Sequence, residues 1–300
     1  MENRTMWGAL TALFALGIHH GLRPQEAEPF LPFEEPALRL VNSVAFSPDD
    51  EVMYFALLHR EVLREIGLPA DEAPETALFY ADRTAEGWSY PELLPFSGEY
   101  KDYEPTLSAD GSLMVFNSAR PYADGRVPEK NDLWSVERKG DDWGEPVRIE
   151  VLTEFDREES YGSLSADRTL VFLREGRVDG KPGFDLYSSA FVDGNFTEAQ
   201  RHPVSTERFG EGDPWIAPDG SYLLFTRWDD ELGWAESVDL HIAFAKDGEW
   251  TKGIPLEELN TPGADYGPAV SPDGQWLYYR ADSMFQRTPM APLLRKYRPG

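Results

Sequence analysis

The sequence predicts an all-β protein, a β-propeller of four-stranded blades, with five blades favoured and six possible. Three observations support this fold class. One short segment recurs five times along the 300 residues, each copy precedes an apolar run, and the stretches between copies show no helical period. Four short strands in every repeat of about 50 residues are typical of propeller blades.

The recurring segment ends in a tight turn. Asp-Gly suits such a turn because glycine accepts the positive φ that hairpin turns require. Asp50 and Arg168 replace this glycine in two copies, and arginine fits the conformation less well. The turn aspartates are 61, 57, 52 and 54 residues apart. The copies are Val44–Asp50, Pro105–Gly111, Gly162–Arg168, Pro214–Gly220 and Pro268–Gly274.

Each repeat then supplies three more strands. The second strand is the apolar run after the turn, and the third begins with Asp-Leu-aromatic or a variant of it. An aromatic residue eleven positions after the start of the third strand opens a fourth strand of the type Trp143-Gly144-Glu145-Pro146. The third strands are Ala77–Phe79, Asp132–Trp134, Asp185–Tyr187 and Asp239–His241, and the aromatic residues are Trp88, Trp143, Phe196 and Trp250.

The first and last repeats differ from the others. The first carries a long insertion, within which residues 59–66 are predicted to form a short helix. The fifth lacks recognisable third and fourth strands, and an open sheet edge would favour aggregation. Residues 27–33 resemble a fourth strand, so we expect the N-terminal segment to complete the last blade. The last residues of the chain, Arg295–Arg298, are then expected to form a loose tail.

Composition narrows the class of partner and the compartment. The net charge of −26 argues against nucleic acid and anionic lipid as partners, and the absence of cysteine excludes disulfides and thiolate chemistry. Residues 7–18 are uncharged and mostly apolar, too short to span a bilayer. We therefore predict a signal peptide or leader over residues 1–27, a single propeller domain over 28–300, and a periplasmic or secreted location.

The compound pattern of Ser-Pro-Asp-Gly turns, Asp-Leu-Trp strands and Trp-x-x-Pro strands resembles the TolB-type propeller repeat, a WD-like family. The resemblance covers about residues 28–282. It implies a periplasmic propeller that works through protein contacts and has no enzymatic activity of its own. The family's best-known member has six blades and a second domain, whereas the repeats here indicate five blades and one domain.

The sequence offers few candidate catalytic or metal-binding residues. The sequence contains none of the familiar hydrolase, nucleotide or zinc motifs. Four repeats carry an acid eight positions before the turn aspartate, and equivalent positions in a propeller converge around its axis. Clustered carboxylates raise one another's pKa or recruit a cation such as calcium. The alternative is that each acid caps backbone N–H groups of its own turn or pairs with an arginine after the second strand. The acids are Asp102, Glu159, Glu211 and Asp265, and the arginines are Arg120, Arg174, Arg227 and Arg280.

Three functions remain open from the sequence. The one it favours is a non-catalytic, monomeric binding or scaffolding module with a protein or peptide partner at the channel mouth and no cofactor. The second is an envelope hydrolase or lyase that acts on glycans and uses two carboxylates as acid and base. The third is a sensor that binds a small molecule or calcium in the channel.

Overall fold

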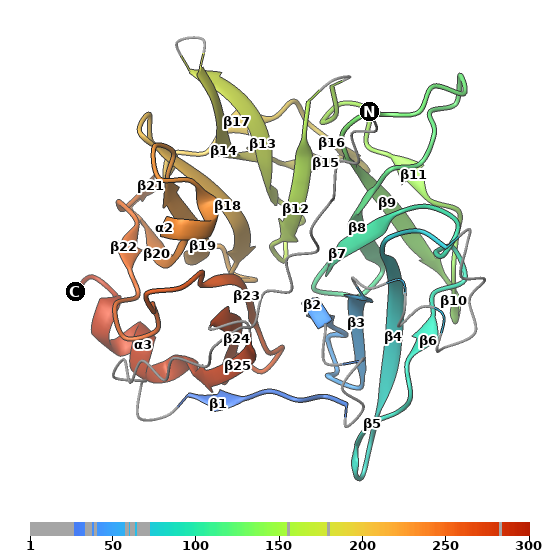
Figure 1. Ribbon diagram of the computed structural model, residues 1–300, viewed down its shortest axis with the longest axis horizontal. Coiled ribbons are helices and arrows are strands. Elements are labelled where there is room, and N and C mark those ends of the chain that lie inside the picture. Colours follow the sequence, from blue (N-terminus) through green and yellow to red (C-terminus); the bar gives the residue numbers. More distant parts are fainter. Residues whose placement is uncertain are drawn as a thin grey trace, which may run out of the picture.

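Five antiparallel sheets stand around a central axis in the computed structural model (Figure 1). The first strand of each repeat (β2, β7, β12, β18 and β23) lies nearest the axis, and the shortest strands lie at the rim. The prediction of a propeller with five four-stranded blades is therefore confirmed. The structure describes residues 27–33, 38, 41–57, 60, 64, 73–154, 157–178, 181–281 and 284–300.

The first three blades run in chain order from the axis outward. Blade 1 contains β2 (Val41–Phe46), β3 (Val52–Leu57), β4 (Ala77–Thr84), β5 (Gly87–Trp88) and β6 (Glu92–Leu93). Blade 2 contains β7 (Asp102–Leu107), β8 (Leu113–Ser118), β9 (Asp132–Lys139), β10 (Asp142–Trp143) and β11 (Val147–Arg148). Blade 3 contains β12 (Glu159–Leu164), β13 (Leu170–Val178), β14 (Lys181–Ser189), β15 (Phe191–Val192), β16 (Asn195–Phe196) and β17 (Gln200–Arg201).

The last two blades carry the two described helices. Blade 4 contains β18 (Phe209–Ile216), β19 (Tyr222–Asp229), α2 (Trp234–Ser237), β20 (Asp239–Lys246), β21 (Glu249–Trp250) and β22 (Ile254–Pro255). Blade 5 contains β23 (Tyr266–Val270), β24 (Trp276–Ala281), β25 (Met284–Pro289) and β1 (Glu28–Pro29), with α3 (Met290–Tyr297) after β25.

In blades 1, 2 and 4 the fourth strand is divided into two short pieces that pair with the same third strand. In blade 2, Trp143 in β10 continues the hairpin by pairing with Arg138, and Val147 in β11 then pairs with Ser135 farther along β9. The Trp143 ring lies 6.0 Å, centroid to centroid, from that of Tyr54 in blade 1. The recurring aromatic residue of this blade therefore packs between two blades.

A side-chain hydrogen-bond network fixes the tight turns. The Ser108 hydroxyl donates to Asp110 Oδ1 at 2.6 Å and accepts the Leu113 N–H at 3.0 Å, which closes the turn before β8. Asp50 and Arg168 adopt the same left-handed conformation, both with φ 61°, as the glycines of the other copies. Arg168 also donates to Asp110 Oδ2 of blade 2 at 2.9 Å, so its side chain links two blades.

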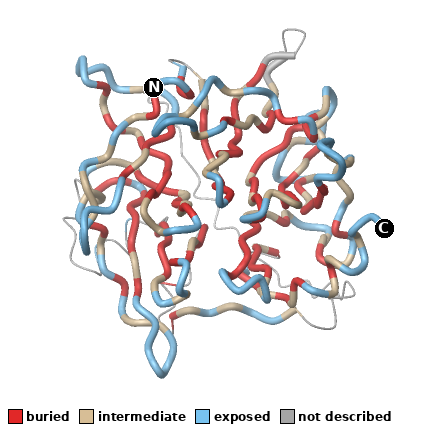
Figure 2. The backbone as a smooth tube through the Cα atoms, turned by 180° about the vertical axis from the view of Figure 1, so that it is seen from behind, coloured by how far each residue is buried: buried red, intermediate tan, exposed pale blue. Residues whose placement is uncertain are grey.

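The apolar core lies along the second and third strands of each blade, where buried residues predominate (Figure 2). Phe55, Phe116, Phe172 and Phe225 occupy matching places on the second strands and are fully buried. Apolar clusters join neighbouring blades. Because each blade is buried against its neighbours, the ring holds the inner strands in fixed positions around the axis.

The N-terminal segment closes the ring, as predicted. Glu28 of β1 pairs with Arg287 of β25, and the Phe30 N–H donates to the Phe285 carbonyl at 2.8 Å. Blade 5 therefore combines strands from both ends of the described chain.

Two expectations for the fifth repeat are wrong. A third strand, β25, is present without the Asp-Leu-aromatic motif because Phe285 and Thr288 supply its buried side chains. The C-terminal tail, Arg295–Arg298, is not loose, since α3 extends to Tyr297, which packs against the cluster that contains Leu240, and Lys296 donates to Glu258 at 2.8 Å.

Two other sequence predictions fall outside the described residues. These are the leader over residues 1–27, of which only Ala27 is described, and most of the helix over residues 59–66. In the described part of the chain, no helix has the length and apolar character needed to cross a membrane.

Candidate active site in the central channel

The four predicted acids are buried inside the blades. Asp102, Glu159 and Glu211 are the first or third residues of inner strands, Asp265 directly precedes β23, and all four have an exposed fraction of 0%. Three make the ion pairs considered from the sequence. Arg120 pairs with Asp102, Arg174 Nε lies 3.1 Å from Glu159 Oε1, and Arg227 Nε lies 3.0 Å from Glu211 Oε1.

The fourth acid has a different arrangement. Asp265 accepts hydrogen bonds from the backbone N–H and the hydroxyl of Thr261. Arg280, the corresponding arginine, donates to the Val41 carbonyl of blade 1 at 3.1 Å. Val41 is the residue that replaces the acid in the first repeat, so here the arginine bonds to backbone in the neighbouring blade.

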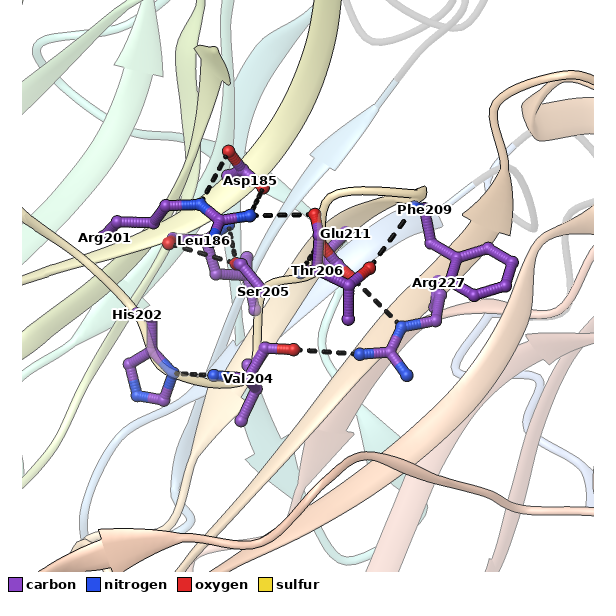
Figure 3. Close-up of polar contacts among 10 residues, drawn as sticks. All are labelled: Asp185, Leu186, Arg201, His202, Val204, Ser205, Thr206, Phe209, Glu211 and Arg227. Carbon is purple, nitrogen blue, oxygen red and sulfur yellow. Dashed lines mark hydrogen bonds and ion pairs between the residues drawn. The ribbon is translucent and has the colours of Figure 1, made fainter. Parts of the chain in front are cut away.

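Figure 3 shows how one of these acids is held. Glu211 accepts hydrogen bonds from the Thr206 hydroxyl at 2.9 Å and from Arg227 Nε, while Arg227 Nη2 donates to the Val204 carbonyl at 2.9 Å. Arg201, beside it, donates to Asp185 and to the Thr206 carbonyl. Glu211 thus ties β18 to the loop that connects it with blade 3.

Burial dominates the protonation of these carboxyls. It raises the pKa of Glu159 to about 8 and that of Glu211 to about 7, and it raises the pKa of Asp102, although the arginines oppose the shift. None of the four lines the cavity described next, within the part of the chain that the structure describes.

The central channel contains a cavity of about 300 Å³, lined by residues from the inner strands of all five blades. Every inner strand has a register shift two residues after its buried acid or the equivalent Val41. The residues at this bulge in blades 2 to 5 have positive φ, namely Glu104 at 51°, Tyr161 at 55°, Asp213 at 43° and Gly267 at 65°. All four line the cavity.

Backbone strain marks three of these positions. Positive φ costs a non-glycine residue of the order of 1 to 3 kcal/mol, and such residues concentrate at functional sites. Gly267 occupies the equivalent place in blade 5 without that cost. Glutamate, tyrosine and aspartate are therefore held in a conformation that glycine would adopt more easily, at positions that line the channel.

The Asp213 carboxyl is largely removed from solvent and still borders the channel. It lies deep among the blades, yet part of its surface is open to the channel. Burial raises its pKa to about 6, opposed by hydrogen bonds to Oδ2 from the Gly267 N–H and the Thr226 hydroxyl, both at 3.3 Å. No cationic group is among the causes of the shift, and Asp213 takes up a proton as the pH falls through about 6.

Two tyrosines lie near both channel carboxylates. Burial raises the pKa of Tyr161 well above its usual range, and the charges of Asp213 and Glu104 raise it further. Burial also raises the pKa of Tyr266; Arg280 opposes this shift, and the same two carboxylates add to it. Both phenols therefore stay protonated and are hydrogen-bond donors at pH 7.

The Tyr161 backbone is fixed from the neighbouring blade. Asn117 of β8 accepts the Tyr161 N–H at 3.0 Å and donates to the Glu159 carbonyl at 3.0 Å. One side chain therefore bridges the two backbone groups that flank Ser160, so the bulge is held in register from blade 2.

Sequence reasoning placed the acids at the correct strand ends but missed this site. The signal was available two positions later, in the pairs Asp102-x-Glu104, Glu159-x-Tyr161, Glu211-x-Asp213 and Asp265-x-Gly267. Side chains alternate across a strand, so the first acid and the residue two positions later would share a face in a regular strand. The bulge redirects the chain, and only the second residue reaches the channel.

The described residues contain no cluster of side chains suited to bind a metal ion. No group of three or more histidine, aspartate or glutamate side chains there is arranged to hold an ion. His202 and His241 are buried beside aromatic rings, and burial lowers the pKa of each to about 4. Both imidazoles are neutral residues of the core.

Comparisons with known proteins concern the fold. No family model and no curated protein matches the sequence. Among solved structures, a gluconolactonase from Xanthomonas campestris matches with a TM-score of 0.49 and 14% identity, over 84% of this chain and 72% of that one. A puromycin-hydrolysing peptidase from Mycobacterium tuberculosis matches with a TM-score of 0.43 and 14% identity, over 80% of this chain and 33% of the peptidase. At this identity the likeness is one of propeller fold alone.

The solved structures that this chain resembles include hydrolytic enzymes, the gluconolactonase and puromycin hydrolases among them, and in this they contradict the prediction of a non-catalytic scaffold. Because the likeness is one of fold, catalysis by this chain is stated below as a proposal. That prediction rested on the absence of sequence motifs. Such motifs detect a catalytic group only where its neighbours are adjacent in the sequence, whereas a propeller channel collects single residues from separate blades.

Proposed function

We propose that the protein is a hydrolase or lyase that uses a pair of carboxylates in the central channel for acid and base catalysis on a small substrate. One observation carries the proposal: Asp213 is desolvated, has a pKa of about 6, and faces the same cavity as Glu104. A carboxyl group with a raised pKa is suited to donate a proton near neutral pH.

The proposed chemistry for hydrolysis is as follows. Glu104 accepts a proton from a water molecule while that water attacks the substrate and the bond to the leaving oxygen breaks. Asp213 donates its proton to the leaving oxygen. Tyr161, which stays protonated, donates a hydrogen bond to negative charge that develops on the substrate. The cavity of about 300 Å³ admits one small molecule and suits a sugar derivative, ester or lactone.

The test is turnover of a panel of 4-nitrophenyl glycosides, 4-nitrophenyl esters and lactones by wild type, Asp213→Asn and Glu104→Gln. We expect each variant to lose at least about a hundredfold in kcat/KM, because each removes one partner of general acid–base catalysis. Glu86→Gln, at an exposed position on the rim, makes the same charge change and should keep full activity. Turnover that survives both channel substitutions, or no turnover of any compound, would contradict the proposal.

The pH profile identifies the acid. If protonated Asp213 is the active form, log(kcat/KM) should fall with a slope of about −1 as the pH rises above about 6. Asp213→Asn should remove this slope from its residual activity. A profile that stays level from pH 6 to pH 8 in the wild type would exclude Asp213 as the acid.

The buried carboxyl of Asp213 should also lower the stability of the folded protein at high pH, where it is ionised. A carboxyl with a raised pKa in the folded protein contributes stability that is fully present below its unfolded pKa of 3.8 and lost as the pH rises through about 6. Asp213→Asn removes this ionisation, so we expect it to be more stable than wild type at pH 8, with a much smaller difference at pH 4. Thermal unfolding at both values measures this. A variant destabilised at pH 8 would mean that Asp213 serves the fold.

We also propose that the repeat is of the TolB type and that the enzyme works in the periplasm or outside the cell. The support is the repeat pattern and the uncharged residues 7–18. Fractionation of cells that express the full chain tests the location. Recovery in the cytoplasm, with the N-terminal residues intact, would contradict it.

A further inference from the structure

We infer that Thr226 is a positioning residue for the proposed acid. Together with the Gly267 N–H it holds Oδ2 of Asp213, so that the acidic proton is carried on Oδ1, the oxygen left to the channel. The inference rests on the proposed function only for the word acid. The orientation of the carboxyl is argued from hydrogen bonds and burial.

Two donors converge on one oxygen of the Asp213 carboxyl. The Thr226 hydroxyl oxygen comes from β19 of the same blade and the Gly267 nitrogen from β23 of blade 5, and each lies 3.3 Å from Oδ2. Two hydrogen bonds occupy both lone pairs of that oxygen, so Oδ2 is the carbonyl oxygen when the group is protonated. The proton of neutral Asp213 is therefore on Oδ1.

The other oxygen of this carboxyl borders the channel. In the described part of the chain no group makes a hydrogen bond to Oδ1, and Oδ1 is not one of the fully enclosed polar atoms that lack a partner. Asp213 itself lines the cavity. A substrate in the cavity can therefore take the proton from Oδ1 without breaking either bond to Oδ2.

The repeat does not require a hydroxyl group at Thr226. The residue after the fully buried phenylalanine of the second strand is Ala56 in blade 1, Asn117 in blade 2 and Leu173 in blade 3. Asn117 uses this place to hold the backbone of the bulge in the next blade, and Thr226 uses it to hold Asp213. In both cases the polar side chain fixes a bulge residue that lines the channel.

The surroundings of Thr226 fix the direction of its hydroxyl. Thr226 is fully buried and lies opposite Gly212, the last residue of β18 to pair with β19 before the register shift of the bulge. A β-branched side chain has few rotamers. The hydroxyl therefore keeps one direction relative to the bulge and limits rotation of the Asp213 carboxyl.

The other titratable groups around Asp213 do not replace this bond. Tyr161 of β12 and Tyr266 of β23 interact with its charge but stay protonated at pH 7, and Glu104 of β7 lines the same cavity. The two hydrogen bonds to Oδ2 favour the ionised carboxylate and so oppose the effect of burial on the pKa. Loss of one of them should raise the pKa of Asp213 above about 6.

The test is carbon-13 NMR titration of the aspartate carboxyls of the full chain, with Asp213→Asn to assign the signal. In Thr226→Val, which keeps the shape of the side chain without its donor, we expect the pKa of Asp213 to rise by about half a unit to one unit. Thr226→Ser keeps the donor and should titrate closer to wild type. An unchanged pKa in Thr226→Val would overturn the inference.

Three controls make this result specific. Thr153→Val makes the same change at another buried threonine, whose hydroxyl donates to the Ile149 carbonyl at 3.2 Å, and an equal shift there would overturn the assignment. Thr226→Ala also lacks the donor and carries the same prediction if circular dichroism shows that Thr226→Val does not fold. Repetition in a Glu104→Gln background removes any coupled titration with the second carboxylate.

Turnover separates this inference from the proposed function. In the proposed enzyme, Thr226→Val should lower kcat about tenfold with little change in KM, and the fall of log(kcat/KM) should move to higher pH with the pKa. A wild-type pH profile in an active Thr226→Val would overturn the inference and leave the enzyme. A raised pKa of Asp213 in this variant, with no turnover of any compound by wild type, would support the orientation of the carboxyl and overturn the enzyme.

Discussion

Replacement of Arg227 by methionine is expected to lower the free energy of unfolding by about 3 to 5 kcal/mol. The substitution leaves Glu211, which is fully buried, without the guanidinium 3.0 Å from its carboxylate. It also removes the donor to the Val204 carbonyl. Without its partner, the buried carboxyl of Glu211 must either keep an uncompensated charge or take up a proton at pH 7.5, and both cost stability, so the loss exceeds the value of the ion pair itself. Urea unfolding at pH 7.5 measures it.

The double variant Arg227→Met with Glu211→Gln is the control. It removes the charge as well as its partner, so we expect it to recover more than half of the loss. The free energy of unfolding of the single variant Arg227→Met should also depend on pH. Burial already raises the pKa of Glu211 to about 7, and its contribution is fully present below the unfolded pKa of 4.5 and lost as the pH rises through the folded pKa. A single variant no less stable at pH 8 than at pH 5, or a double variant as unstable as the single one, would contradict this account.

Truncation of Phe33 to alanine, in a separate variant, is expected to lower the free energy of unfolding by about 3 to 5 kcal/mol. Phe33 is 5% exposed, and its ring centroid lies 5.3 Å from that of Phe55 in blade 1. It belongs to the apolar cluster that also contains Tyr278 and Phe285 of blade 5. The cavity would therefore open where the N-terminal segment joins the first and last blades. Urea unfolding is again the measurement.

Leu31→Ala on the same segment is the matched control. Leu31 is 53% exposed, so its truncation should change stability by less than about 0.5 kcal/mol. A Phe33→Ala variant as stable as Leu31→Ala would mean that the ring is closed by backbone pairing of β1 with β25 alone.

Much of the architecture could be predicted because it repeats. The Ser-x-Asp turns, the buried second strands and the Asp-Leu-aromatic third strands are local patterns, and five copies make a chance match improbable. The N-terminal contribution to blade 5 followed from the resemblance of residues 27–33 to a fourth strand. By contrast, β25 and α3 lack the repeat pattern. Their buried side chains are specified by the neighbouring blade, so they were missed.

The sequence by itself favoured five blades over six and determined the positions of the turns and the pairing choices open to Asp102, Glu159 and Glu211. Tertiary structure alone decided which carboxylates face the channel. Each inner strand bulges two residues after its buried acid, and this local change of direction encloses the first carboxylate in the blade and presents Glu104 or Asp213 to the axis. The two residues are 109 positions apart in the sequence, and only closure of the ring brings them to one cavity.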